Sequence, residues 1–206
     1  EQRNENLWQF YDRSEHNLET QFGASFDYWL GKKVYFNVFD NVRLNRSRIA
    51  RNFFSDTDEQ NVVGGTPTTA DPTNTTRRLT NKWTNKLTVK STITPVKALM
   101  IMPKFSWNYC REKTDYHYGP LDTTAVRTSN TYEPSIFLKW KMSRVRNMDI
   151  AFAYNTTVPD LVSTLGYRNT IDPLHIYMGN PLLRNSHSHT TTYNLSLIHI
   201  SEPTRH

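Results

Sequence analysis

Several common signatures are missing from this sequence, and each absence excludes a class of protein. The 206 residues contain one cysteine, Cys110, which excludes an internal disulfide framework and a multi-cysteine metal site. The mean hydropathy is -0.69 and no long apolar run occurs, so a transmembrane helix is excluded. Gly64-Gly65 is not followed by Gly-Lys-Ser/Thr, and no nucleophile elbow accompanies a Ser/His/Asp set. The sequence therefore gives no indication of an enzyme.

The sequence is basic, with a formal net charge of +6, but it carries no signature of nucleic-acid binding. Its Lys and Arg residues are spread out, without an RNP-type aromatic motif, zinc-finger spacing or a continuous basic helix. His187 and His189 lie two positions apart, with His175 nearby, yet no carboxylate or cysteine completes a metal-ligand set. We therefore expect no nucleic-acid partner, no metal and no cofactor.

What the sequence does contain is long stretches in which apolar and polar side chains alternate. Between Tyr132 and Met142 the even positions are apolar and the odd positions are mostly charged or polar. After a short connection the alternation resumes from Met148 to Tyr154. Because successive side chains of a strand point to opposite faces, this pattern predicts a β-hairpin with one apolar face. Its length suits the ~9–11 residues that a tilted strand needs to cross a bilayer.

Four earlier segments show the same two-faced pattern, and short turns join them in pairs at Gly31–Lys33 and Thr94–Lys97. Asp40 interrupts one of the apolar faces. Pro103 cannot donate a ladder hydrogen bond, so we expect a bulge or a local break there. The expected strands are Asn17–Leu30, Val34–Leu44, Trp83–Ile93 and Leu99–Tyr109.

Long connections are expected between these hairpins, at Ile49–Lys82, Arg111–Thr131 and Thr156–Asn185, because these segments are polar and contain turn-forming residues. Glu1–His16 is likewise expected to be the end of a loop. The alternation of short and long connections is typical of a transmembrane β-barrel with long loops at one rim. The predicted fold class is therefore all-β: an antiparallel up-and-down meander, part of a large transmembrane β-barrel that is incomplete, with about six to seven strands.

Aromatic residues are expected at both ends of these strands. Trp and Tyr rings prefer the two interfaces between membrane and water, although they could also cover the core of a soluble protein. Tyr28 and Trp140 lie near the short turns. Next to the long connections lie Trp83, Trp107, Tyr109, Tyr132 and Tyr154.

The segment after the hairpin resembles a known family. It contains Pro159, then Asp172-Pro173, and then Gly179-Asn180-Pro181-Leu182 before another strand. This succession resembles the late barrel region of TonB-dependent receptors and related outer-membrane β-barrel proteins of the Bacteroidetes type. The resemblance implies a fragment of the C-terminal half of a barrel of ~22 strands with a plugged lumen. It also implies location in the outer membrane, uptake of an unidentified solute, and contact with TonB through a plug domain.

Two other functions stay open at this point: a structural or adhesive outer-membrane barrel without transport, and a soluble all-β binding protein. In a receptor, the solute is expected at the long connections and the lumen, with no single binding residue. Arg77, Arg78 and Lys82 near one rim are expected to touch lipopolysaccharide phosphates, beside the outer-membrane lipid. Lysines on the polar faces would either attract anionic solutes, pair with plug acids, or be solvated. They are Lys86, Lys90, Lys104, Lys139 and Lys141.

Both ends of the sequence are expected to differ from those of the natural protein. The chain starts at Glu1 rather than Met, so we expect the true N-terminus, with any signal peptide, to lie upstream. Residues 195–206 read LSLIHISEPTRH, which is similar to the translation of a transposase adapter. We therefore expect residues 1–194 to be a partial barrel domain and 195–206, with His199 and His206, to be a non-native tail. The alternative is a natural strand that continues through Leu195 and beyond.

Overall fold

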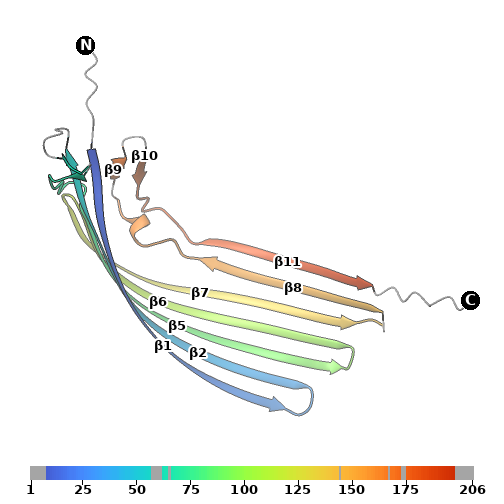
Figure 1. The fold of residues 1–206 in the computed structure, drawn as a ribbon. Helices are drawn as coiled ribbons and strands as arrows, with labels where there is room; N and C mark the ends of the chain where they lie inside the picture. Colours follow the sequence, from blue (N-terminus) through green and yellow to red (C-terminus); the bar gives the residue numbers. More distant parts are fainter. Residues whose placement is uncertain are drawn as a thin grey trace, which may run out of the picture.

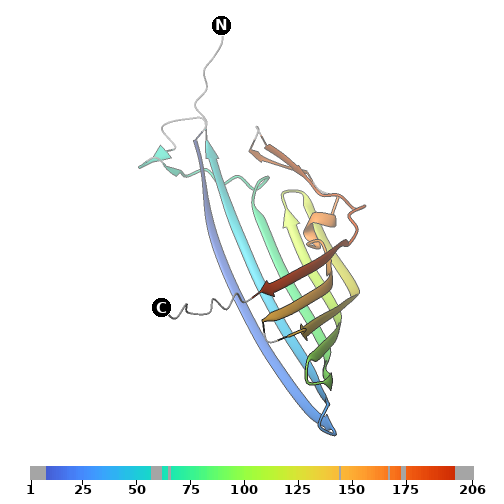
Figure 2. The ribbon, with the colours of Figure 1, turned by 90° about the vertical axis from the view of Figure 1, so that its right-hand side faces the viewer.

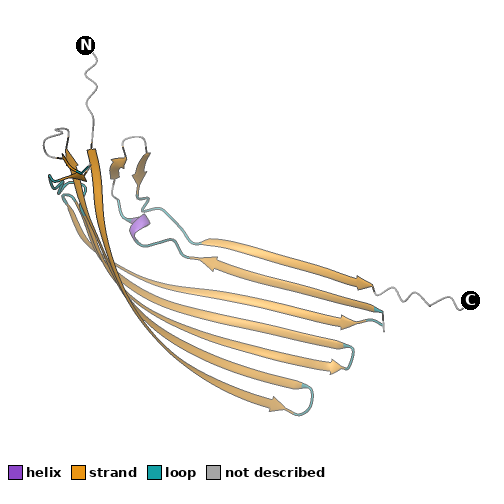
Figure 3. Ribbon diagram, in the orientation of Figure 1, coloured by secondary structure: helices purple, strands orange, loops and turns teal. Residues whose placement is uncertain are grey.

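The structure, a computed structural model, consists mainly of one long antiparallel sheet (Figures 1 and 3). It describes residues 8–56, 62–64, 66–143, 145–166, 168–172 and 175–197. Seven strands pair in the order β1-β2-β5-β6-β7-β8-β11, each with the one before it in the meander. They are β1 (Trp8–Leu30), β2 (Val34–Asp56), β5 (Thr76–Val96), β6 (Leu99–Tyr118), β7 (Leu121–Lys141), β8 (Arg146–Thr157) and β11 (Ser186–Leu197). The predicted all-β, antiparallel up-and-down meander is thereby confirmed.

Two connections at one end of the sheet carry small elements of their own. Between β2 and β5 lie the short strands β3 (Val62–Val63) and β4 (Thr66–Pro67). Between β8 and β11 lie the 3₁₀-helix η2 (Val162–Thr164) and the strands β9 (Arg168–Asp172) and β10 (His175–Met178). Among the described residues, no helix has the length and apolar character needed to cross a membrane.

The prediction of a long connection at Arg111–Thr131 is wrong. β6 and β7 continue through this segment and are joined by a turn at Gly119-Pro120, with Tyr118 paired to Leu121. Gly119 has a φ of 54°, a left-handed conformation that glycine adopts without the steric cost of a Cβ. Polar residues such as Glu112, Thr114 and Thr124 interrupt the apolar ones on both faces of the hairpin here, so the alternation that marks a strand in the sequence is lost.

The other strands are also longer at the same end than their apolar pattern indicates. β1 begins at Trp8, so the stretch up to His16 is strand rather than loop. The expected connection Ile49–Lys82 shrinks to residues 57–75, because β2 runs to Asp56 and β5 starts at Thr76. The long connection between β8 and β11 is present as expected. The hydrogen-bonded ladder therefore extends well past the apolar part of the sheet.

The two faces of the sheet differ in chemistry and in exposure. In β7, residues from Leu121 to Phe137 alternate between less and more exposed along the strand, with the even-numbered ones exposed. The sheet is curved into an open trough with β1 and β11 at its edges (Figure 2). Side chains converge on a concave surface, so the less exposed face is the inner one. We call the face that carries the even residues of β7 the outer face.

The outer face carries a broad apolar band that no other part of the described chain covers. Its exposed members include Phe22, Phe26, Tyr28, Leu44, Trp83, Val89, Phe105, Tyr132, Ile136, Trp140 and Phe152. The solvent-accessible surface is 15316 Å², against about 10,000 Å² for a compact monomer of this mass. A soluble sandwich would pack a second large sheet on this band, whereas the other sheets among the described residues are the two-stranded pairs β3–β4 and β9–β10.

Aromatic rings form a row along the upper edge of the band, on neighbouring strands. Trp83 and Tyr109 meet edge to face with centroids 5.2 Å apart, and Phe105 stacks on Tyr132 at 6.1 Å. Because the strands are longer than expected, this row crosses the middle of β5, β6 and β7 rather than their ends. The ladder therefore continues beyond the apolar band.

Two irregular residues of the sequence have a local explanation. Asp40 does lie on the outer face, where Asn85 of the neighbouring strand donates a hydrogen bond to its carboxylate at 2.8 Å. Beside Pro103, the β5–β6 pairing is interrupted between Lys90–Lys104 and Ile93–Ile101 without a change of register. The expected local break at Pro103 is therefore found on its β5 side, whereas pairing with β7 is continuous.

The proposed non-native tail begins inside the last strand. Asn194, Leu195 and Ser196 continue the ladder with β8, and the remainder of the tail, from residue 198 with His199 and His206, lies outside the described residues. Backbone pairing at a sheet edge accepts many sequences, so this pairing does not test the origin of the tail. The division at residue 194 stays a prediction.

Candidate functional site

A polar groove of about 710 Å³ runs along the inner face of the sheet. Five strands contribute to it, from β1 to β7, and residues 158–160 close one side. Its lining residues include Arg43, Asn45, Lys82, Thr84, Lys86, Asn108, Cys110, Glu112, Arg127, Ser129 and Thr131. They come from one parity of each strand, so the same alternation that makes the outer face apolar makes this groove polar.

A buried ion pair crosses the groove between β6 and β7. Arg127 donates to the Glu112 carboxylate at 3.1 Å, and Glu112 is only 4% exposed. The two residues are directly opposite each other in the ladder. On the next rung, the hydroxyl groups of Thr80 and Thr114 are hydrogen-bonded at 3.1 Å. These contacts fix the Thr80, Glu112 and Arg127 side chains, which line the groove.

A second polar cluster lies lower in the groove. Glu133 accepts hydrogen bonds from Lys86 at 3.0 Å and from Asn108 at 2.9 Å. Asn108 also donates to the Thr131 hydroxyl at 3.3 Å. Lys86 is thus paired within the sheet. Lys90 and Lys104 instead face each other across the ladder, and no ion pair to either is present among the described residues.

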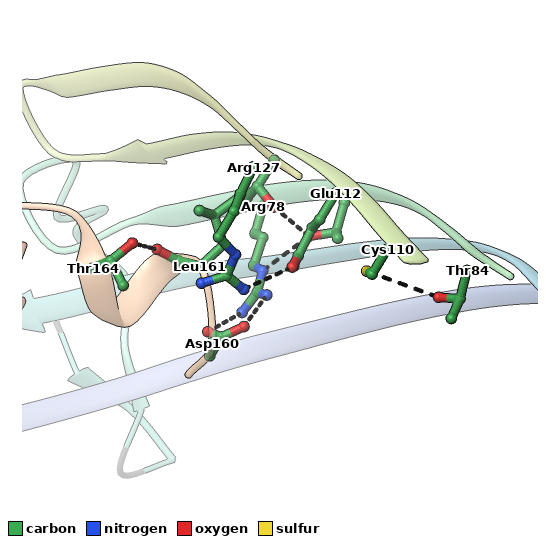
Figure 4. Close-up of polar contacts among 10 residues, drawn as sticks. Arg78, Thr84, Cys110, Glu112, Arg127, Asp160, Leu161 and Thr164 are labelled. Carbon is green, nitrogen blue, oxygen red and sulfur yellow. Dashed lines mark hydrogen bonds and ion pairs between the residues drawn. The ribbon is translucent and has the colours of Figure 1, made fainter. Parts of the chain in front are cut away.

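Residues 158–165 fold over the inner face, and we call this segment the strap. Asp160 accepts two hydrogen bonds from the Arg78 guanidinium, at 2.9 and 3.2 Å (Figure 4). Val162 is 6% exposed and packs with Tyr116 and Tyr118 in a small apolar cluster. Leu161, next to it, is 4% exposed. The strap is therefore held by one bidentate ion pair and one buried apolar contact.

The turn that carries the family resemblance supports the strap. The backbone N–H of Asn180 donates to the carbonyl of Ser163 at 2.8 Å. The Asn180 side chain accepts from the N–H of Leu182 at 2.9 Å, which is ordinary Asx-turn chemistry. Gly179-Asn180-Pro181-Leu182 thus forms the turn that holds the strap and leads toward β11. Pro173 lies outside the described residues.

Asp71 holds the connection between β2 and β5, which we call the rim connection. Burial raises the pKa of this carboxyl, but hydrogen bonds from Asn74, Ser55 and the backbone of Thr73 outweigh burial and hold its pKa below its usual value. Tyr118 at the hairpin tip donates to Asn74 at 3.2 Å. The connection and the tip of the β6–β7 hairpin are therefore tied together.

The structure separates the residues expected to touch lipopolysaccharide. Arg78 points to the inner face and binds Asp160, and Lys82 also lines the inner groove. Only Arg77 keeps its place on the outer face, because adjacent residues of a strand alternate sides. Arg78 and Lys82 therefore do not share the position of Arg77, and the expected contact with lipopolysaccharide stays a prediction.

The ladder places the five lysines of the polar faces on the inner face, as expected. His187 and His189 lie on the outer face of β11 and pack on Tyr154, whose hydroxyl is 2.6 Å from Nδ1 of His187. The described residues hold no group of three or more potential metal ligands, and the His175 side chain is outside that set. Cys110 lies in the middle of β6, with the Thr84 hydroxyl 3.8 Å from its sulfur (Figure 4).

No protein-family model matches the sequence, and no curated protein does. Among solved structures, the fold is similar to that of the ferric citrate transporter FecA in its unliganded form, with a TM-score of 0.52 and 13% sequence identity. The likeness covers 73% of this chain and 22% of that one, so the chain spans about a fifth of the transporter's length. At this identity the likeness shows the fold alone: a segment of a β-barrel of the kind that forms that transporter.

Proposed function

We propose that this sheet is part of an outer-membrane β-barrel of the TonB-dependent receptor type, which takes up an unidentified solute. The observation that carries the proposal is the exposed apolar band on the outer face of the sheet and the polar groove on its inner face, with almost no core between them. A lipid-facing wall around an aqueous lumen requires this division, because lipid-facing and lumen-facing residues alternate along every strand. The similarity to the fold of a transporter agrees with it.

The solute would bind in the inner groove and at the rim that carries the long connections. The groove offers fixed hydrogen-bond donors and acceptors, while the strap narrows it from one side. TonB would act through a plug domain that fills the lumen, and the basic inner face would meet that plug or the solute. No described arrangement favours catalysis, so the proposed role is binding and transport without chemical conversion.

A structural or adhesive barrel is the second candidate, and the strap is the feature that separates the two. A barrel that serves only as a wall has no need of a segment held inside its lumen by Arg78 and Asp160. Removal of the strap should increase solute passage if the barrel transports, and should leave the membrane permeability unchanged in a closed structural barrel.

Leu138→Arg in the full-length protein tests the membrane assignment. Leu138 lies on the outer face of β7, opposite Ile101 and Ile150 on the neighbouring strands. An arginine at the bilayer midplane costs roughly 2–4 kcal/mol, so the amount of folded protein in the outer-membrane fraction should fall. The matched control is Ala151→Arg, which places the same side chain on the inner face of β8, opposite Phe137.

The measurement is the heat-modifiable, folded band in isolated outer membranes. We expect a strong decrease for Leu138→Arg and a small one for Ala151→Arg. Equal folded amounts for both variants would contradict the assignment of the outer face to lipid, and with it the proposed function.

A further inference from the structure

The Arg78 guanidinium is oriented by the sheet and not by the carboxylate that it binds. Its Nε donates a hydrogen bond to the Thr80 hydroxyl at 3.0 Å. Thr80 is in turn hydrogen-bonded to the Thr114 hydroxyl at 3.1 Å, and Thr114 is 0% exposed. The two terminal nitrogens remain, and both donate to Asp160 (Figure 4). Because a guanidinium presents such a pair of donors in a fixed geometry, Arg78 is equally suited to another carboxylate.

The pair of Arg78 and Asp160 differs from the other ion pairs along the groove in where its carboxylate comes from. Asp160 belongs to the strap, which follows the end of β8. Each of the other pairs joins two strands of the ladder: Arg43 with Glu19, Lys86 with Glu133, and Arg127 with Glu112. Among these described pairs, Asp160 is therefore the carboxylate whose backbone can move away while every rung of the ladder stays in place.

The groove next to Arg78 also contains a cation without an ion pair. Lys82 lines the groove, four residues after Arg78 on the same face of β5. No ion pair to Lys82 is found in the part of the chain that the structure describes. About 13 Å of strand separates the two residues, and the ammonium group of Lys82 raises the local concentration of anions. A solute with an anionic group is therefore drawn toward the position that Asp160 occupies.

We propose that Asp160 is an internal competitor of the solute. The solute carries a carboxylate, this group replaces Asp160 on the Arg78 guanidinium, and the strap then opens. The inference rests on the proposed uptake function and deepens it, because it gives the solute a chemical class and the strap a role. The exchange keeps Arg78 paired, and it returns to water a carboxylate whose side chain is already 47% exposed.

The second contact of the strap makes the opening reversible. Leu161 and Val162 are 4% and 6% exposed, and Val162 packs against Tyr116 and Tyr118. Loss of the ion pair does not change these apolar surfaces, so their burial favours the closed strap again once the solute has left. The strap therefore narrows an empty groove and leaves an occupied one open.

The test tethers a carboxylate beside Arg78, since the solute is unidentified. The variant Ser47→Cys is made in a full-length protein without other thiols, with Cys110→Ser. Position 47 lines the groove and lies directly opposite Thr80. Iodoacetate converts the new thiol to a thioether that ends in a carboxylate, whereas iodoacetamide gives a thioether of nearly the same volume that ends in a neutral amide. The two products differ in charge, so a difference between them reports the carboxylate alone.

The readout is hydrogen exchange of the strap, followed by mass spectrometry on the folded protein in detergent. The backbone N–H groups of Thr164 and Leu165 donate within the strap, so they exchange when it opens. We expect roughly 5-fold faster exchange with the carboxylate than with the amide, which corresponds to about 1 kcal/mol for an exposed ion pair. Asp160→Asn, which removes the competitor, should give the same increase without any label.

Two controls separate competition at Arg78 from a general effect of charge. In Arg78→Met the two products at position 47 should exchange alike. The same reagents on Ser129→Cys, which also lines the groove, should leave the strap unchanged.

Equal exchange for the two products at position 47 would overturn the inference, and so would unchanged exchange in Asp160→Asn. Either result leaves the membrane assignment intact, because Leu138→Arg and its control test that assignment separately. A failure of the proposed function would instead appear in those two variants.

Discussion

The buried pair of Glu112 and Arg127 allows a quantitative test of the inner face. Arg127→Met keeps most of the side-chain volume but removes the cation, which leaves a carboxylate that is 4% exposed without its partner. Breaking a fully buried ion pair costs about 3–5 kcal/mol. The Arg127 side chain is 23% exposed and borders an open groove, so water reaches one side of the pair. We therefore expect a loss of about 2–3 kcal/mol in the free energy of unfolding.

The double variant Glu112→Gln/Arg127→Met removes both charges and should recover most of this loss, to within about 1 kcal/mol of wild type. Arg43→Met is the matched control, since Arg43 pairs with Glu19 on the same face at 3.2 Å, with side chains 50% and 42% exposed. Such an exposed pair contributes at most about 1 kcal/mol. The assay is urea unfolding of the full-length protein in lipid at neutral pH. If the double variant is as unstable as the single one, the unpaired charge is not the cause and the reasoning fails.

Three further substitutions test the rim and the outer face. Gly119→Ala places a Cβ 2.4 Å from a backbone oxygen at a φ of +54°, so it should lower the free energy of unfolding, measured by thermal unfolding, by at least about 2 kcal/mol. Gly31→Ala is the control and should have a smaller effect, because Gly31 has a φ of +65° but lies in open space. Because the pKa of Asp71 is lowered in the folded protein, its ionised carboxyl stabilises the folded state at pH values above the unfolded-state pKa of about 3.9. This stabilisation is lost as the pH falls through the lower, folded-state pKa. Asp71→Asn should therefore increase proteolysis of the rim connection at neutral pH, and the difference from wild type should disappear in strong acid. Asn85→Leu leaves Asp40 without its hydrogen-bond donor on the outer face, so it should lower the free energy of unfolding by about 1–3 kcal/mol and thereby the amount of folded protein in membranes. The double variant Asp40→Leu/Asn85→Leu should restore both.

The parts of the fold that sequence reasoning predicted correctly are those where the two faces differ in polarity. In Tyr132–Met142 and Met148–Tyr154 nearly every second residue is large and apolar, and the structure places these residues on one face of the hairpin, as predicted. Beyond the aromatic row, apolar and polar residues no longer alternate, so the pattern that predicts a strand is absent. Arg111 and Glu112 are both charged, although they lie on opposite sides of β6, because water or polar groups adjoin both faces there. The Gly119-Pro120 turn, with the aromatic residues Tyr116 and Tyr118 before it and β-branched residues after it, is the signal that could have revealed this hairpin.

The candidate site depends on contacts that no local pattern carries. Arg78 and Asp160 are 82 positions apart, and their ion pair exists only because the strap folds back over the sheet. The outer-face position of several cations was missed for a related reason. Arg46 and Arg48 lay at the border of an expected loop, and a residue in a loop has no defined side. Once β2 is extended to Asp56, strand parity alone assigns Arg46, Arg48 and Arg77 to the outer face and Arg78 to the inner one.

The tie between the hairpin tip and the rim connection has a practical consequence for protein engineering. The N–H of Gly119 donates to the carbonyl of Thr75 at 3.3 Å, so the tip is fastened to its neighbour and offers no free end. An epitope tag inserted at Gly119-Pro120 would have to break that contact. At Gly64, which directly follows β3, a side chain would meet open space, so an insertion there is the better choice.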